Sequence, residues 1–226
     1  MSKTKKKKLF LELLLLALIL LLAIFLWDTI IIYPVKLMIV LLHEISHGLA
    51  AILTGGKVID LDINLDLSGF SKIEGGNKFI IASSGYLGSL IFGMILFYSG
   101  YQNKFRNIVL PIIASLIIIF LINSSSNQNL ILISIGIIFL LFLLNNFLPI
   151  PISTLIYKAL GLISCFYVLI DIKQDILDSD STISDAAVIA EITGTIPTIW
   201  GMLWLIISII AIFLLIKLSY TKSLRS

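Results

Sequence analysis

Both histidines of this 226-residue chain, His43 and His47, are four residues apart, and Glu44 directly follows the first of them. On a helix, residues four apart lie on one face, so the two imidazoles can reach one metal ion while the glutamate holds and deprotonates a water molecule. The His-Glu-x-x-His pattern is typical of zinc-assisted hydrolysis of a peptide bond. We therefore expect Zn²⁺ as the cofactor, with His43 and His47 as metal ligands and Glu44 as the catalytic base.

The composition around this motif is that of a membrane protein. Hydrophobic residues make up 59% of the chain, charged residues 13%, and the mean hydropathy is +1.11. Such long apolar runs exclude an ordinary soluble globule. Ionisable residues at membrane depth are costly and usually functional. A metal site therefore explains the motif better than the alternative, a hydrogen-bonded Glu-His pair that joins two membrane helices.

The apolar runs predict an all-α polytopic membrane protein with six to seven transmembrane helices in one integral membrane domain. The expected spans are 9–27, 33–54, 79–98, 108–122, 130–148, 152–170 and 198–218. The lysines at the N-terminus predict that this terminus is cytoplasmic, with the chain in the cell membrane, and do not indicate nucleic-acid binding. Strict alternation of seven spans then puts the basic C-terminus outside. The positive-inside tendency disfavours that ending, which leaves the span count open.

Residues 57–76 change to the period of a half-buried strand and predict a small cytoplasmic β-hairpin directly after the metal-motif helix. Apolar and polar side chains alternate through 59–67, and a return strand is expected after a turn. The acidic face does not fit a calcium loop, because Leu65 stands where that loop needs glycine. An exposed strand edge can pair with an extended substrate, so Asp62 and Asn64 are expected to bind substrate.

The one strongly acidic and weakly apolar stretch covers residues 171–194. Ser184 followed by Asp185 is typical of a helix start, and Gly194 is typical of a helix end. The sequence therefore predicts an acidic cytoplasmic segment that contains one short helix.

Several motifs resemble the short, peptidase B-like branch of the site-2-protease-type intramembrane zinc metallopeptidases. They are HEISHG at 43–48, TGGKV at 54–58, EGG at 74–76, SGYLGS at 84–89, DIKQD at 171–175, SDA at 184–186 and WGMLW at 200–204. The resemblance implies a zinc site within the lipid bilayer and cleavage of a transmembrane segment of a membrane-protein substrate, as in regulated intramembrane proteolysis. These motifs identify neither the particular substrate nor an oligomeric state.

One departure from the family pattern concerns the third metal ligand. Site-2 proteases carry N-x-x-P followed by L-D-G, whose aspartate is that ligand. This chain has NFLP at 146–149, but Thr154 stands in place of the aspartate. A hydroxyl is a poor zinc ligand beside two imidazoles, so either the ligand comes from elsewhere or catalysis has been lost. Asn146 is a candidate to hydrogen-bond the oxyanion of the reaction.

Three aspartates are candidates for the missing ligand. Asp171 is preferred, because the expected order of spans places it on the side of the membrane that holds the two histidines. Asp175 lies one turn further along and shares its face. Asp185 is a further alternative, although its position favours a helix cap. The competing interpretation of all three is a solvated acidic loop.

Three classes of function follow from these features. The leading one is an intramembrane zinc endopeptidase. The second is a catalytically silent membrane scaffold or chaperone that keeps the protease fold, which the missing aspartate favours. A transporter is weakly supported, because the two halves of the chain show no inverted repeat.

Overall fold

The described part of the chain, residues 3–123, 127–177 and 184–225 of a computed structural model, forms eight helices and one two-stranded sheet. In chain order these are α1 (Lys3–Phe25), α2 (Tyr33–Leu53), β1 (Lys57–Ile63), β2 (Gly69–Glu74), α3 (Lys78–Ser99), α4 (Asn103–Asn123), α5 (Gln128–Asn146), α6 (Ile150–Leu177), α7 (Asp185–Thr193) and α8 (Pro197–Arg225). Six of them, α2 to α6 and α8, are long and apolar enough to cross a membrane, whereas the apolar part of α1, Leu9–Phe25, is shorter. The predicted class, a helical membrane protein with a small hairpin, is confirmed.

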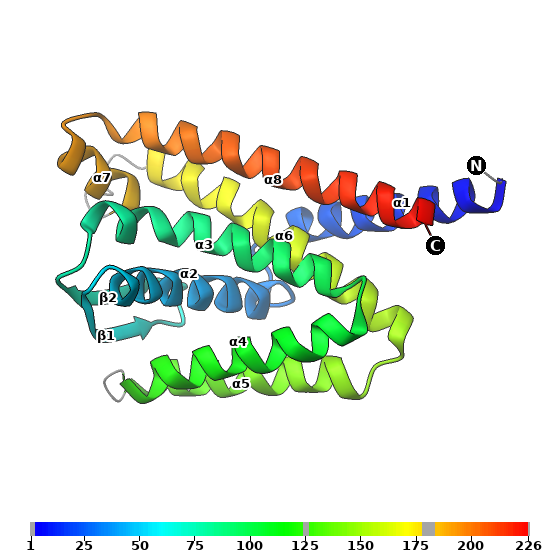
Figure 1. Ribbon diagram of the computed structural model, residues 1–226, viewed down its shortest axis with the longest axis horizontal. Helices are drawn as coiled ribbons and strands as arrows, with labels where there is room; N and C mark the ends of the chain where they lie inside the picture. Colours follow the sequence, from blue (N-terminus) through cyan, green and yellow to red (C-terminus); the bar gives the residue numbers. More distant parts are fainter. Residues whose placement is uncertain (1–2, 124–126, 178–183, 226) are drawn as a thin grey trace.

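Helices α1 and α2 run one after the other in the same direction, and the two chain termini lie at one end of the molecule (Figure 1). From α2 onward the membrane-length helices alternate in direction, so the hairpin and α7 lie at the opposite end (Figure 1). We call these the terminal end and the hairpin end. Strict alternation of seven spans would require α1 to be antiparallel to α2, and it is not.

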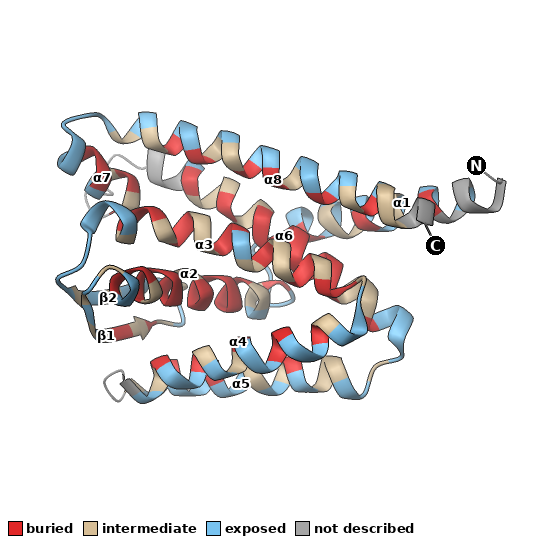
Figure 2. Ribbon diagram, in the orientation of Figure 1, coloured by how far each residue is buried: buried red, intermediate tan, exposed pale blue. Residues whose placement is uncertain are grey.

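Helix α2 lies at the centre of the bundle, where buried residues cover most of its surface (Figure 2). In its most apolar stretch 72% of the residues are buried, compared with 28% for α5 and α8. Pro34 lies in its first turn, where the missing N–H costs no helical hydrogen bond. It ends before Gly55, whose φ of +83° is a left-handed conformation that favours glycine. The polar residues of the motif are therefore enclosed by protein.

The hairpin lies alongside α2. The strands pair antiparallel, with Leu61 opposite Ser71, and the side chains of Leu61 and Ile63 are fully buried in the core. At the turn, the carbonyl of Leu65 accepts a hydrogen bond from the hydroxyl of Tyr33 in the first turn of α2. The hairpin therefore covers the helix that carries the metal motif.

A bulge interrupts the alternation expected for the first strand. The regular register breaks between Val58 and Asp60, and Ile59 is 44% exposed. The buried face therefore begins only after the bulge, because the extra residue shifts the side-chain alternation.

The acidic stretch divides between two helices. Helix α6 continues through Asp171 to Leu177, and residues 178–183 lie outside the described part of the chain. Ser184 caps α7, because its Oγ atom accepts a 3.2 Å hydrogen bond from the backbone N–H of Ala187. Asp185 is thus the first helical residue, and its side chain is available for contacts away from α7.

Candidate metal centre

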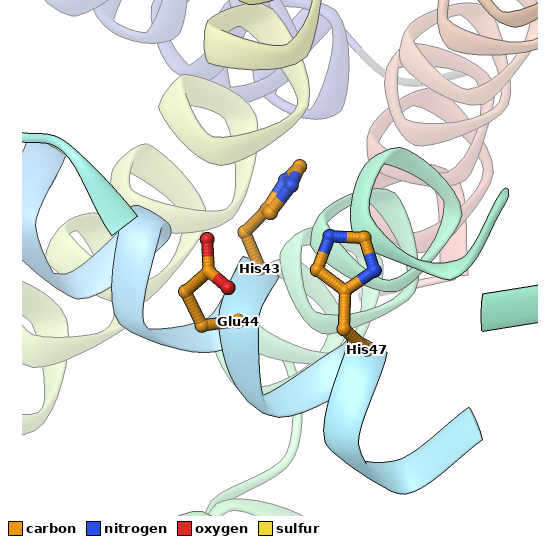
Figure 3. A group of neighbouring side chains, drawn as sticks. All are labelled: His43, Glu44 and His47. Carbon is orange, nitrogen blue, oxygen red and sulfur yellow. The ribbon is translucent and has the colours of Figure 1, made fainter. Parts of the chain in front are cut away.

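His43, Glu44 and His47 project from successive turns of α2 into one region of the bundle (Figure 3). One possible ligand atom from each of these residues lies within 4.8 Å of the others. The helix periodicity produces this arrangement, as the four-residue spacing predicts. The three side chains form a cluster that could hold a metal ion.

The orientation of His47 is fixed by the backbone of α3. Its Nδ1 atom lies 2.7 Å from the carbonyl oxygen of Ile81, which can only accept a hydrogen bond. We therefore assign the proton of the neutral ring to Nδ1. That tautomer leaves Nε2 with its lone pair available for a metal, the usual arrangement when a second group orients a metal-binding histidine.

Asp185 reaches both imidazoles from α7. Its Oδ2 atom lies 3.3 Å from Nε2 of His43, and its Oδ1 atom lies 3.4 Å from Nε2 of His47. Burial opposes ionisation of this carboxyl, but the neighbouring His47 and His43 outweigh that effect and lower its pKa to about 2. Asp185 is therefore a carboxylate at neutral pH.

The spacing of these atoms fits metal ligands better than hydrogen-bond partners. A charge-assisted N–H···O⁻ hydrogen bond is about 2.7–2.9 Å long, shorter than both contacts. In a tetrahedral zinc site with ligand bonds of about 2.0–2.1 Å, neighbouring ligand atoms lie about 3.3–3.4 Å apart. In agreement, the Oδ2 atom of Asp185 is buried and has no hydrogen-bond partner among the described residues.

Gly85 of α3 leaves the space in which these ligand atoms meet. A Cβ atom at this position would lie 2.4 Å from Nε2 of His43 and 2.6 Å from Oδ2 of Asp185. Any side chain larger than hydrogen would therefore displace the ligand atoms. Two imidazole nitrogens and one carboxylate, brought together beside a glycine, fit a zinc ion with an open position.

Glu44 is held by the hairpin. Its Oε2 atom accepts a 2.5 Å hydrogen bond from the hydroxyl of Ser71 on β2, and the backbone of Gly69 packs against the same carboxylate. Only 7% of Glu44 is exposed. One carboxylate oxygen is thus oriented by a fixed donor.

A cavity of about 440 Å³ opens at this cluster. Its walls come from α2, β2, α3, α6 and α7, and they include the two histidines, Glu44, Ser71 and Tyr86. This volume lies within the usual range of ligand-binding pockets, about 300–1,000 Å³.

The two other aspartate candidates have different outcomes. Asp171 lines the same cavity from α6, but the contacts that reach both imidazoles come from Asp185. The side chain of Asp175 lies outside the described residues.

The remaining expected site residues lie away from the cavity. Asp62 accepts a hydrogen bond from Asn127 before α5, and Asn64 donates to Ser68 within the hairpin turn. Asn146 is exposed at the end of α5 and bonds to the carbonyl of Phe142. The strand that lines the cavity is β2, through residues such as Ser71.

Two contacts had no clear signal in the sequence. The hydroxyl of Ser71 and the carbonyl of Ile81 meet motif side chains from 27 and 34 residues away. The pairing of the hairpin and the crossing of α3 over α2 create both contacts, and neither follows from local residue patterns.

A buried His-Glu-x-x-His cluster among membrane-length helices is the arrangement of the site-2-protease-type metallopeptidases. A comparison with protein families matches residues 15–215 to the family described as peptidase M50B-like. The match covers every element that lines the cavity, and the chain belongs to this family. Comparisons with curated proteins and with solved structures find no match.

Proposed function

We propose that this membrane protein is an intramembrane zinc metalloprotease that hydrolyses peptide bonds in or near transmembrane segments of other membrane proteins. The observation that carries the proposal is the position of Asp185, whose two carboxylate oxygens each approach one motif histidine. Family membership supports the same chemistry. We further propose the cell membrane as its location.

His43, His47 and Asp185 would hold the zinc ion, and Asp185 takes the place of the L-D-G aspartate that this chain lacks. When bound, zinc supplies Lewis-acid activation of water and of the scissile carbonyl. The bond from His47 to Ile81 orients one ligand, and Gly85 provides the space for all of them.

Glu44 would act as the general base and then as the proton donor to the leaving amine. Ser71 holds its Oε2 atom, so the carboxylate keeps one orientation while Oε1 takes the proton from water. The surrounding hairpin and helices bury this carboxylate, which strengthens its electrostatic interaction with a nearby cation.

We place the substrate segment along β2, because β2 lines the cavity. An extended peptide beside this strand would bring its carbonyl groups toward Glu44 and the metal ligands. Asp62 and Asn64 lie on the other strand and in the turn, so a role for them in binding substrate would be indirect.

The test compares the wild type with Glu44→Gln on a panel of co-expressed single-span membrane proteins. The amide cannot take a proton from water, so the variant should retain zinc and leave every substrate intact. Cleavage by the wild type alone supports the protease. An equally inactive wild type, across the whole panel and with zinc bound, would favour the silent scaffold.

A further inference from the structure

The two histidines of the candidate metal centre are supported in different ways. The imidazole of His47 is oriented by its contact with the carbonyl of Ile81. Among the described residues, the contact that orients the ring of His43 is aromatic. The ring of Tyr86 on α3 packs against it, with the ring centroids 5.5 Å apart and the planes at 88°, a preferred geometry for aromatic pairs. Because Nε2 of His43 lies 3.3 Å from Oδ2 of Asp185, this contact places a proposed metal ligand.

Tyr86 is itself fixed by Trp204 on α8. The two ring centroids lie 4.6 Å apart, and each residue is only 2% exposed. A ring packed this closely inside a protein cannot rotate without displacing its neighbours. The orientation of Tyr86, and through it that of His43, therefore depends on a residue of α8.

Helix α8 is also connected to the helix that begins with Asp185. One turn before Trp204, the Nε1 atom of Trp200 donates a 2.8 Å hydrogen bond to Oγ1 of Thr195, which follows α7. The ring of Trp200 packs against Phe79 at the start of α3, with the centroids 5.3 Å apart. No residue of α8 is among the described residues that line the cavity, yet this helix supports the positions of two proposed ligands.

We propose that Tyr86 and Trp204 are positioning residues of the metal centre. They hold the imidazole of His43 at the angle at which its Nε2 atom meets the other ligand atoms, so α8 belongs to the site without lining it. The motifs SGYLGS at 84–89 and WGMLW at 200–204 thereby acquire a role. This inference rests on the proposed zinc centre, but not on the cleavage of any substrate.

Ordinary core packing is the competing explanation, and it makes a different prediction. If the rings only fill space, their truncation lowers stability and leaves the metal ligands in place. If they position His43, their truncation also changes the metal affinity and the geometry around the ion. Phe97 provides a matched control, because it is a buried aromatic residue of α3 in the same core and its ring packs against Tyr101, away from the ligands.

The test uses the full chain in detergent with Co²⁺ as the probe, because the visible absorption of bound cobalt reports the arrangement of its ligands. Tyr86→Leu should weaken cobalt binding by about 10- to 100-fold, the usual loss when a residue that orients a ligand is removed, and should alter the spectrum. Tyr86→Phe keeps the ring and should restore both the affinity and the spectrum. Trp204→Leu should change both in the same direction as Tyr86→Leu, and Phe97→Leu should lower only the melting temperature.

Wild-type cobalt affinity and spectrum in the Tyr86→Leu protein would overturn the proposal. A Tyr86→Phe protein as defective as Tyr86→Leu would also overturn it, because the ring alone would then not position His43. If Tyr86→Leu does not fold, Trp204→Leu decides the question by the same two measurements. A wild type that binds no cobalt would overturn the metal centre and this inference together, whereas normal binding in the wild type and in every variant would overturn this inference alone.

Discussion

The hydroxyl of Ser71 on β2 donates a 2.5 Å hydrogen bond to Oε2 of Glu44 on α2. This contact joins the hairpin to the proposed catalytic base. A hairpin that covers the metal-motif helix therefore has a role beyond packing, because it determines where the carboxylate points.

Ser71→Ala should lower kcat by about tenfold to a hundredfold, since a hydrogen bond to a charged group contributes about 1.5–3 kcal/mol. KM and zinc content should change little, because Ser71 is not among the proposed metal ligands. Ser71→Thr keeps the hydroxyl and should restore most of the rate. Equal turnover by the alanine variant and the wild type would remove Ser71 from the proposed mechanism.

Gly85→Ala should empty the metal centre. The added Cβ would lie 2.4 Å from Nε2 of His43, a distance that forces the ligand atoms apart. Gly136→Ala is the matched control, because nothing lies within 4 Å of a Cβ added there. Zinc content after purification in detergent measures both, and normal zinc in the Gly85→Ala protein would mean that the ligands meet elsewhere.

Glu12→Ala should destabilise the fold by about 3 kcal/mol, because it leaves the buried ammonium group of Lys158 without its carboxylate. Asp28→Asn is the control: the Asp28 side chain is 94% exposed, and its 3.5 Å pair with Lys36 should contribute less than about 1 kcal/mol. Unfolding in detergent measures both. A loss no larger than that of the control would show that Glu12 does not anchor α1.

Sequence patterns predicted the motif helix and the hairpin well, because both depend on local periodicity. The four-residue spacing of His43 and His47 places them on one helix face in any fold that contains α2. The short helix after Ser184 followed from its cap and from Gly194 in the same way. These features need no knowledge of which helices are neighbours.

The position of Asp185 depends on how α7 packs, and no periodicity indicates that packing. Its place at a helix start suggested a cap, but Ser184 fills that role. The direction of α1 could not be predicted from the sequence either. The length of an apolar segment can be read from the sequence, but the residues that contact Glu12 cannot. Polar contacts between residues far apart in the chain fix both the position of Asp185 and the direction of α1.

Thr154→Asp should not replace Asp185. Thr154 occupies the L-D-G position by sequence, but it lies in the early turns of α6 with its carbonyl oxygen beside Gly100, at the terminal end of the bundle. In an Asp185→Ala background the zinc content should therefore stay low after Thr154→Asp. Recovery of zinc would place the start of α6 at the metal centre, contrary to the structure.

The zinc affinity of detergent-purified protein tests the central claim, that His43, His47 and Asp185 hold one zinc ion. The wild type should carry close to one zinc per chain, and Asp185→Ala should weaken binding by at least the roughly 10- to 100-fold that the loss of a supporting residue causes. Asp171→Ala, which changes another carboxylate of the same cavity, should bind zinc nearly normally. Wild-type affinity in the Asp185→Ala protein, with loss in the Asp171→Ala protein, would contradict this account of the site.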